Sequence, residues 1–368
     1  RSREIARDLG WTETPGDTVS RYGGSNDWIE SVRRESAAPD RWDDIGTVRP
    51  SPIRFWYRAG PDKLEPMNYG ANVSPTDPPE TTAGMVRLTL DPGGRMLEFV
   101  GVTDDRVPED APATDTEPDW SPAFEAAGLD LATADPLPPA RVPRTGAAVR
   151  RAWRAAWIDR PEERVRVEAA AFGGRVTSFE VFAPWEERAW SSDDTSQGPP
   201  GTRTAQWINF AMLALILGGG SFLARRNIRL GRGDRRGATR LAISIGTLYM
   251  AWWALTADHV ASLHGVGMAL DAAAYATLFG AISWMVYLAL EPYVRKIWPD
   301  SVISWSRLLD GRLRDPLVGR DVLLGAVAGV LVALVVAGLN WLGVWLGQPP
   351  AAPSFGGFVA LRGAPTVL

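Results

Sequence analysis

The residues of this sequence that could perform chemistry are few, and the most unusual of them is a carboxylate inside an apolar segment. Asp271 lies about two helical turns within an apolar run at residues 266–290. A carboxylate at that depth in a membrane costs on the order of 3 kcal/mol unless it faces protein or water. Asp271 is therefore a candidate intramembrane polar site, either as a proton relay or as a carboxylate with a structural partner or a path to the membrane surface.

Two histidines and one tripeptide are the other candidates in the same half of the chain. His259 and His264 adjoin Asp258, but their spacing does not place both rings on one helical face, so a polar loop explains them better than a metal site. The Arg-Gly-Asp tripeptide at residues 232–234 lies in a basic loop that follows no strand. That context excludes an adhesion ligand and a dinucleotide-binding turn.

The sequence lacks the residue sets on which common catalytic mechanisms depend. It has no cysteine, which excludes disulfides, zinc fingers, iron–sulfur clusters and thiol nucleophiles. It also has no serine–histidine–aspartate set, no pair of intramembrane glutamates and no nucleotide-binding loop. We therefore expect that the chain is not an enzyme and binds neither a metal nor a cofactor.

A further group of candidates lies in the segment 291–321, between the apolar runs 266–290 and 322–346. Six basic residues in this segment predict that it is a cytoplasmic loop. Its apolar residues recur near helical spacing while its arginines point elsewhere, which predicts an amphipathic helix at the membrane surface. The alternative is a solvated connector whose arginines only set the topology. The apolar positions are Ile303, Trp305, Leu308, Leu309 and Leu313, and the candidate interfacial or regulatory residues are Trp305, Arg307, Arg312, Arg314 and Asp315.

Apolar runs define the second half of the chain as a membrane region. Runs of about 20 residues can cross a hydrocarbon core of about 30 Å. The seven arginines between Arg225 and Arg240 predict a second cytoplasmic loop, whereas the loop 258–265 has no basic residue and is expected outside. Residues 1–200 and the tail 347–368 are then extracytoplasmic. The expected transmembrane helices are residues 205–224, 241–257, 266–290 and 322–346.

Charge separates the two halves. Residues 1–200 hold 24 basic and 35 acidic side chains, and residues 201–368 hold 15 basic and 8 acidic ones. An acidic soluble half joined to a basic membrane half argues against nucleic acid as a partner and favours a lipid bilayer. Abundant Ala, Gly, Pro and Arg with only two lysines is typical of a GC-rich bacterial genome, so we expect a multi-pass protein of the bacterial inner membrane.

The soluble half is expected to have an α+β fold made of two tandem units, each a helix plus an antiparallel sheet. The units span about residues 1–102 and 119–190, and the polar linker 191–204 follows them. Each unit ends in a predicted β-hairpin with a Gly-Gly-Arg turn, at residues 93–95 and 173–175. Four aromatic residues could line a binding groove, although core packing explains them equally well: Trp56, Tyr57, Trp153 and Trp157.

Several motifs resemble the C-terminal membrane region of certain bacterial serine/threonine protein kinases. They are LALEPYVRKIWPDSVISWSRLLDGRLRDPLVGRDVLLG at residues 288–325, RRNIRLGRGDRRGATRLA at 225–242, FWYR at 55–58, GMVRLTLDPGGR at 84–95, RVEAAAFGGR at 166–175 and APW at 183–185. The resemblance implies a cytoplasmic kinase domain elsewhere in the same protein. No Gly-rich loop, His-Arg-Asp or Asp-Phe-Gly motif is present, so no kinase catalytic residue can be assigned to this chain.

These observations predict a membrane-anchoring and sensory region of a receptor-like serine/threonine kinase, used in signal transduction and lacking the catalytic domain. Its partners would be the bilayer, the kinase domain and an extracytoplasmic ligand. The alternative is part of a multi-pass transporter or intramembrane enzyme whose other helices follow residue 368. Because a new apolar run begins near the end of the sequence, we expect the chain to be a fragment.

Overall fold

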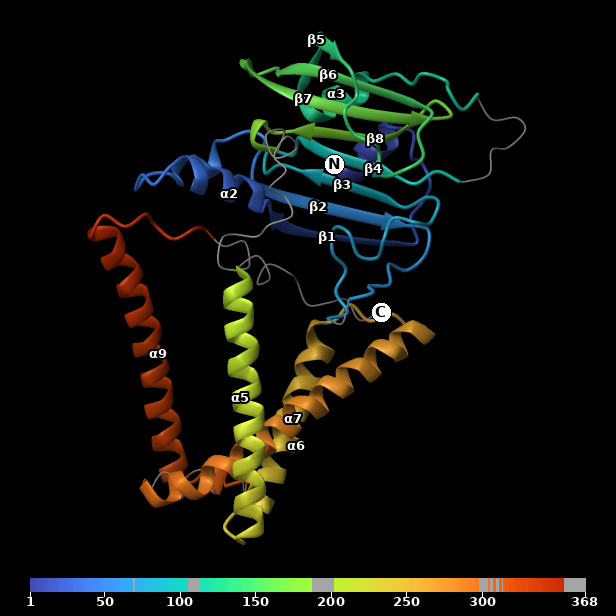
Figure 1. Cartoon of the computed structure of the whole chain (residues 1–368). Coiled ribbons are helices and arrows are strands. Elements are labelled where there is room, and N and C mark those ends of the chain that lie inside the picture. The colour runs from blue at the N-terminus through green and yellow to red at the C-terminus, as the bar shows by residue number, and fades with distance from the viewer. Residues whose placement is uncertain are drawn as a thin grey trace. The chain divides into compact units, whose positions relative to one another are not determined.

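The computed structural model shows two compact units. It describes residues 1–68, 70–104, 113–186, 202–297, 304, 307–308, 311–312 and 314–353. Arg1–Asp193 with Gly347–Leu368 forms one unit, here called the sheet unit, and Asp194–Leu346 forms the other, here called the helical unit (Figure 1).

The sheet unit contains one eight-stranded antiparallel sheet. Its strand order is β1-β2-β3-β4-β8-β7-β6-β5, so the first four strands and the last four meet at β4 and β8. Its elements are α1 (Ser2–Asp8), β1 (Asp17–Gly24), α2 (Asn26–Glu35), the 3₁₀ helix η1 (Asp43–Gly46), β2 (Ile53–Gly60), β3 (Val86–Leu90), β4 (Met96–Gly101), α3 (Ser121–Ala127), β5 (Leu129–Leu137), β6 (Val149–Trp157), β7 (Arg160–Phe172) and β8 (Arg175–Phe182).

Two similar halves build this sheet. In each half a short helix precedes four antiparallel strands, and the two halves join where Phe99 of β4 lies opposite Phe179 of β8. These two phenylalanines hold the same position in the two sequence motifs, four residues after the Gly-Gly-Arg arginine. The expected α+β fold is confirmed, and its strands form one continuous sheet rather than two separate ones.

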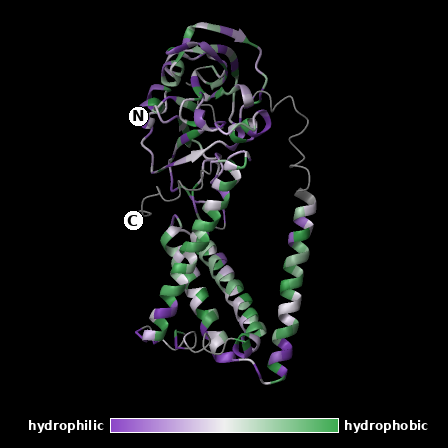
Figure 2. Cartoon of the chain, turned by 90° about the vertical axis from the view of Figure 1, so that its left-hand side faces the viewer, coloured by the Kyte–Doolittle hydropathy of each residue, from purple (hydrophilic) through white to green (hydrophobic). Residues whose placement is uncertain are grey.

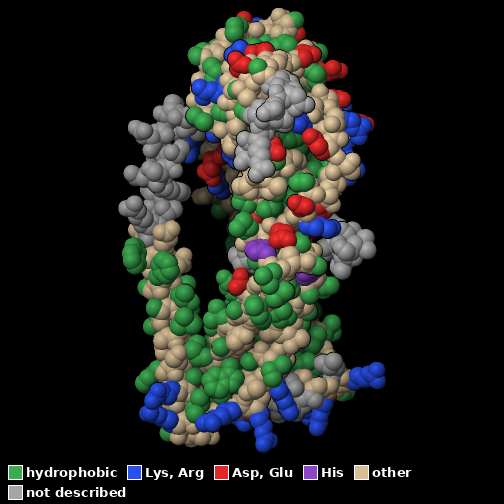
Figure 3. All heavy atoms as spheres, turned by 90° about the vertical axis from the view of Figure 1, so that its right-hand side faces the viewer, with side chains coloured by type: hydrophobic (Ala, Val, Ile, Leu, Met, Phe, Trp, Pro, Cys, Tyr) green, Lys and Arg blue, Asp and Glu red, His purple; other side chains and the backbone are tan. Residues whose placement is uncertain are grey.

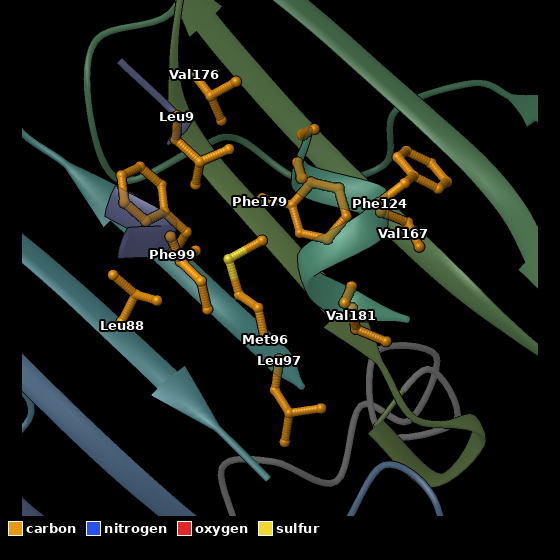
Figure 4. Packing of buried hydrophobic residues seen from close by; sticks show 14 of the residues in the cluster. Leu9, Leu88, Met96, Leu97, Phe99, Phe124, Val167, Val176, Phe179 and Val181 are labelled. Atoms are coloured by element: carbon orange, nitrogen blue, oxygen red, sulfur yellow. The ribbon is translucent and has the colours of Figure 1, made fainter. Parts of the chain in front are cut away.

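The hydrophobic core lies on the sheet face that α1 and α3 cover. Alternate residues of each strand point to opposite faces, so one face of β3, β4, β7 and β8 supplies the apolar side chains. Phe99 and Phe179 are fully buried at the junction, and Phe124 of α3 packs edge-on against Phe179 with ring centroids 5.5 Å apart (Figure 4). Burying each such ring contributes roughly 1.5–3 kcal/mol. The core therefore spans the junction and joins both halves.

The Gly-Gly-Arg arginines link the two halves reciprocally. A Cβ atom at Gly128, which ends α3 with φ +71°, would lie 3.1 Å from Cδ of Arg95. A Cβ atom at Gly10, just after α1, would lie 3.7 Å from Cγ of Arg175. Each arginine therefore packs over the carboxyl end of the other half's helix, where the helix dipole favours positive charge.

The helical unit contains α5 (Thr202–Arg229), α6 (Arg235–Thr256), α7 (Leu263–Ile297) and α9 (Pro316–Trp345). Three segments are long and apolar enough to cross a membrane: Thr204–Arg229, Leu263–Ile297 and Pro316–Trp345. Hydrophobic residues cover most of their length (Figure 2). The segment predicted as a fourth crossing, 241–257, is helical in α6 almost throughout, but α6 is not among these three. Its crossing stays a prediction.

The helix ends differ from the sequence expectation, by six or seven residues at the start of α6, the end of α7 and the start of α9. α7 continues through Pro292 to Ile297, beyond the predicted end at residue 290, and α9 begins at Pro316 rather than at residue 322. Asp315 explains the earlier start of α9, because its side chain accepts a hydrogen bond from the backbone N–H of Leu317 and caps the helix. The predicted loop 291–321 is correspondingly shorter.

Candidate functional site

Two of the loop residues singled out from the sequence, Arg307 and Asp315, contact each other at the start of α9. Nη1 of Arg307 donates to the carboxylate of Asp315 at 2.9 Å, and this carboxylate also caps α9. The hydrogen bond from Leu317 and the Arg307 guanidinium hold the pKa of Asp315 below its usual range. The backbone N–H of Arg312 donates to the carbonyl of Arg307 at 3.0 Å, and Arg314 is exposed. These contacts give Arg307 and Asp315 a structural role.

The rest of the predicted amphipathic helix stays a prediction. Trp305 and the other apolar positions Ile303, Leu309 and Leu313 lie outside the described residues. Lys and Arg side chains do gather at one end of the helical unit, below its hydrophobic flanks (Figure 3). The seven arginines of residues 225–240 lie at the end of α5, at the start of α6 and between them.

Within the described residues, no hydrogen bond or ion pair joins Asp271 to another predicted site residue. Asp271 is exposed on α7, next to the buried Ala272. His259 Nε2 lies 2.9 Å from the carbonyl oxygen of Ala254, and its ring packs on Trp253. Within the described residues, no group of three or more His, Cys, Asp or Glu side chains could hold a metal ion.

A buried asparagine that the sequence reading did not single out joins α5 to α7. Nδ2 of Asn227 donates to the carbonyl oxygens of Leu288 at 2.9 Å and Ala289 at 3.1 Å. In a regular helix the N–H of residue 292 would bind the Leu288 carbonyl, but Pro292 has no N–H. Asn227 therefore satisfies the acceptor that Pro292 leaves open. Pro292, two residues after the apolar run 266–290, is the sequence signal that could have revealed this contact.

The most site-like feature of the sheet unit is a groove beside α1, here called the α1 groove. Its volume is about 420 Å³, within the range of small-molecule sites. Arg3 and Arg7 of α1 line it, together with Arg175 at the start of β8. Its apolar lining comes from Ala6, Trp11, Tyr57, Ala59, Val86 and Val102.

Trp11 and Arg175 are held rigidly in this groove. Nε1 of Trp11 donates to the carbonyl of Val176 at 2.9 Å, and its ring packs so closely on Gly101 that a Cβ there would overlap it. The guanidinium carbon of Arg175 lies 4.3 Å from the centroid of the Trp11 ring. Nη2 of Arg175 also lies 3.2 Å from both carboxylate oxygens of Glu13. The groove thus presents a preorganised cation beside an apolar surface.

A second groove lies between the η1 segment of the first half and strands β6 and β7 of the second half. Its volume is about 400 Å³, and Val165 of β7 lines it. Arg49, Arg160 and Arg164 contribute to its lining, together with the buried Trp157. Nε1 of Trp157 has no hydrogen-bond partner in the described part of the chain. The aromatic residues Tyr57 and Trp157 therefore serve both core packing and groove lining, the two roles the sequence left open.

Carboxylates form a row on the sheet face that points away from α1 and α3. Glu180 of β8 lies opposite Glu98 of β4 and opposite Glu168 of β7. Burial, followed by repulsion from Glu98, raises the pKa of Glu180 to about 7. Arg141 partly offsets this effect from 3.6 Å away and stacks on Phe182. The cavity at this row is only about 40 Å³, too small for a ligand beyond a water-sized group.

Comparisons with known proteins do not assign a family to this arrangement. No protein-family model, curated protein or solved structure matches the chain. Its function must therefore be argued from its own residues.

Proposed function

We propose that this chain is the sensory and membrane-anchoring region of a bacterial receptor-like serine/threonine protein kinase, without its catalytic domain. The observation that carries the sensory part is the α1 groove, a preformed recess in a folded unit that is covalently attached to apolar helices. The helical unit anchors the protein in the inner membrane. Arginines at the helix ends, seven of them within residues 225–240, keep that side cytoplasmic.

The kinase part of this proposal rests on the sequence motifs alone, above all the long motif at residues 288–325. In proteins with that region the kinase domain is cytoplasmic and precedes the extracytoplasmic domain. An outer binding domain and basic inner loops are the arrangement that such a receptor requires.

A reporter fusion tests the topology. Alkaline phosphatase, which is active only in the periplasm, is fused after Gln197 in the linker, and a cytoplasm-active fluorescent protein is fused at the same point as the matched control. We expect phosphatase activity without fluorescence. Fluorescence without phosphatase activity would place the sheet unit in the cytoplasm and eliminate the sensory role.

The coding sequence around this segment tests the kinase part. We expect an in-frame kinase domain upstream of Arg1, with its Gly-rich loop and its His-Arg-Asp and Asp-Phe-Gly motifs. Polar motifs in further downstream helices, without any kinase domain, would instead support a transporter or an intramembrane enzyme.

A further inference from the structure

The α1 groove differs in charge from the unit that contains it. Residues 1–200 carry a net charge of −11, yet the described residues that line this groove include three arginines and two carboxylates, Glu13 and Asp104. One net positive charge therefore remains beside an apolar surface. A monoanion would balance it, whereas a cation or a multiply charged anion would not.

The arrangement of the arginines suits a carboxylate. Arg3 and Arg7 are four residues apart on α1, so they lie on the same side of the helix. Both are exposed, and within the described residues the Arg3 guanidinium donates one hydrogen bond, to the Thr18 hydroxyl at 3.5 Å. Arginine binds carboxylates through paired N–H donors, and partial exclusion of water strengthens such bonds.

The apolar lining of the groove favours a ligand that also carries an apolar group. Ala59, Val86 and Trp11 are each less than 10% exposed and come from β2, β3 and the segment between α1 and β1. A ring or short aliphatic chain placed on them would remove further apolar surface from water, which is worth about 25 cal/mol per Å². The rigid Trp11–Arg175 pair limits the entropy lost on binding.

We infer that the α1 groove binds a small monocarboxylate with an apolar body, with the carboxylate at Arg3 and Arg7 and the apolar part on Trp11, Ala59 and Val86. This inference rests on the proposed sensory function and names the class of ligand that is sensed. Arg175 packs on Trp11 and is paired with Glu13, so Arg3 and Arg7 supply the positive charge that the ligand meets.

The test uses the full chain in nanodiscs of zwitterionic lipid and a fluorinated probe, 3-(4-fluorophenyl)propionate. Its uncharged partner, 3-(4-fluorophenyl)propionamide, has the same ring, and empty nanodiscs correct for partition into lipid. Binding is measured by ¹⁹F NMR line broadening. We expect saturable binding of the carboxylate that is roughly tenfold tighter than binding of the amide, because a hydrogen bond to a charged group is worth about 1.5 kcal/mol or more.

Two matched variants locate the site. Arg3→Gln with Arg7→Gln should weaken carboxylate binding roughly tenfold. Arg33→Gln with Arg34→Gln makes the same change of charge on α2, outside the groove lining, and should leave affinity within about twofold. Circular dichroism confirms that both variants fold, since the four arginines are exposed.

Three results would overturn the inference: equal affinity for acid and amide, equal loss in both double variants, or no saturable binding up to roughly 10 mM. None of them depends on topology or on a kinase domain. A failure here would therefore leave the fusion result intact, and a failure of the fusion experiment would leave the measured affinity intact.

Discussion

At the scale of single residues, the stability of the sheet unit depends on partly buried charged side chains. Glu180 shares its sheet face with Glu98 and Glu168, and Arg141, Arg144 and Glu186 add to its electrostatic surroundings. Gly128 depends on backbone conformation instead, since its φ of +71° is strained for any residue with a Cβ. The contribution of each residue to the free energy of unfolding can be measured by equilibrium unfolding.

Glu180 should make the stability of the sheet unit depend on pH. Its pKa of about 7 in the folded state lies above the ordinary value of 4.5, so protonation stabilises the fold. That stabilisation is complete below about pH 4.5 and is lost as the pH rises to about 7. Because 35% of the side chain is exposed and solvent screens its repulsion, we expect a loss of only about 1 kcal/mol.

The measurement is urea unfolding of the full chain in detergent at pH 5 and pH 8, followed by circular dichroism. Glu180→Gln should abolish this part of the pH dependence. Ser178→Ala, at the same strand junction but without a titratable group, should keep the wild-type profile. An unchanged pH profile for Glu180→Gln would show that other groups cause the dependence.

Gly128→Ala should lower the free energy of unfolding of the sheet unit by about 1 to 2 kcal/mol. The added Cβ is strained by the backbone conformation and would displace Arg95, which it approaches to 3.1 Å. Gly46→Ala is the matched control, because a Cβ there meets no atom within 4 Å and its φ is not in the left-handed region. Equal urea midpoints for the two variants would contradict this account.

At the scale of elements, proline and asparagine on different helices act as one structural unit. α7 stays helical through Pro292, and the buried Asn227 of α5 donates to the carbonyl that this proline leaves open. Asn209 and Asn340, which lie within apolar runs, are exposed on α5 and α9 instead. The asparagine that connects helices is thus the one near the basic end of α5, not one in the middle of an apolar run.

A double-mutant cycle tests this pairing. Asn227→Leu should destabilise the helical unit by about 1 kcal/mol, the typical scale of an interhelical hydrogen bond in a membrane protein. The same change should cost less in a Pro292→Ala background, because residue 292 then supplies the missing N–H. Asn340→Leu serves as the control. Stability is read from SDS unfolding in mixed micelles, and additive effects of the two substitutions would rule out the coupling.

At the scale of the whole molecule, the topology depends on whether α6 crosses the membrane. Its first six residues include Arg235, Arg236 and Arg240, so its apolar part is shorter than those of the three helices that qualify as spans. If α6 crosses, the loop between α6 and α7 faces outward and the arginines before α6 face inward. The two sides can then be distinguished by chemical labelling.

Because the chain has no natural cysteine, single-cysteine variants can be labelled without background. Ser262→Cys should react with a membrane-impermeant maleimide in spheroplasts. Arg232→Cys should react only after the membrane is permeabilised. Labelling of both variants under the same condition would show that α6 does not cross, whereas the predicted pattern would establish the fourth span.

The sequence alone determined the features that depend on local composition and periodicity. Apolar runs define helices because every residue of a membrane-spanning segment must be compatible with lipid. The run 205–224 lies within α5, and all but the last residue of the run 322–346 lies within α9. The hairpins at the two Gly-Gly-Arg motifs were also predictable, because alternating residues and glycine turns act over a few positions.

Only the tertiary structure decided the contacts between residues far apart in the chain. The pairing of Phe99 with Phe179, the packing of Arg95 on Gly128 and the bond from Asn227 to Leu288 each join segments that no local pattern relates. The α1 groove also depends on contacts between distant segments, because Arg3 and Arg175 line the same groove only when β8 lies beside β4. A binding surface of this kind is created by the way the halves pack, and packing energy depends on complementary shapes that a linear pattern does not encode.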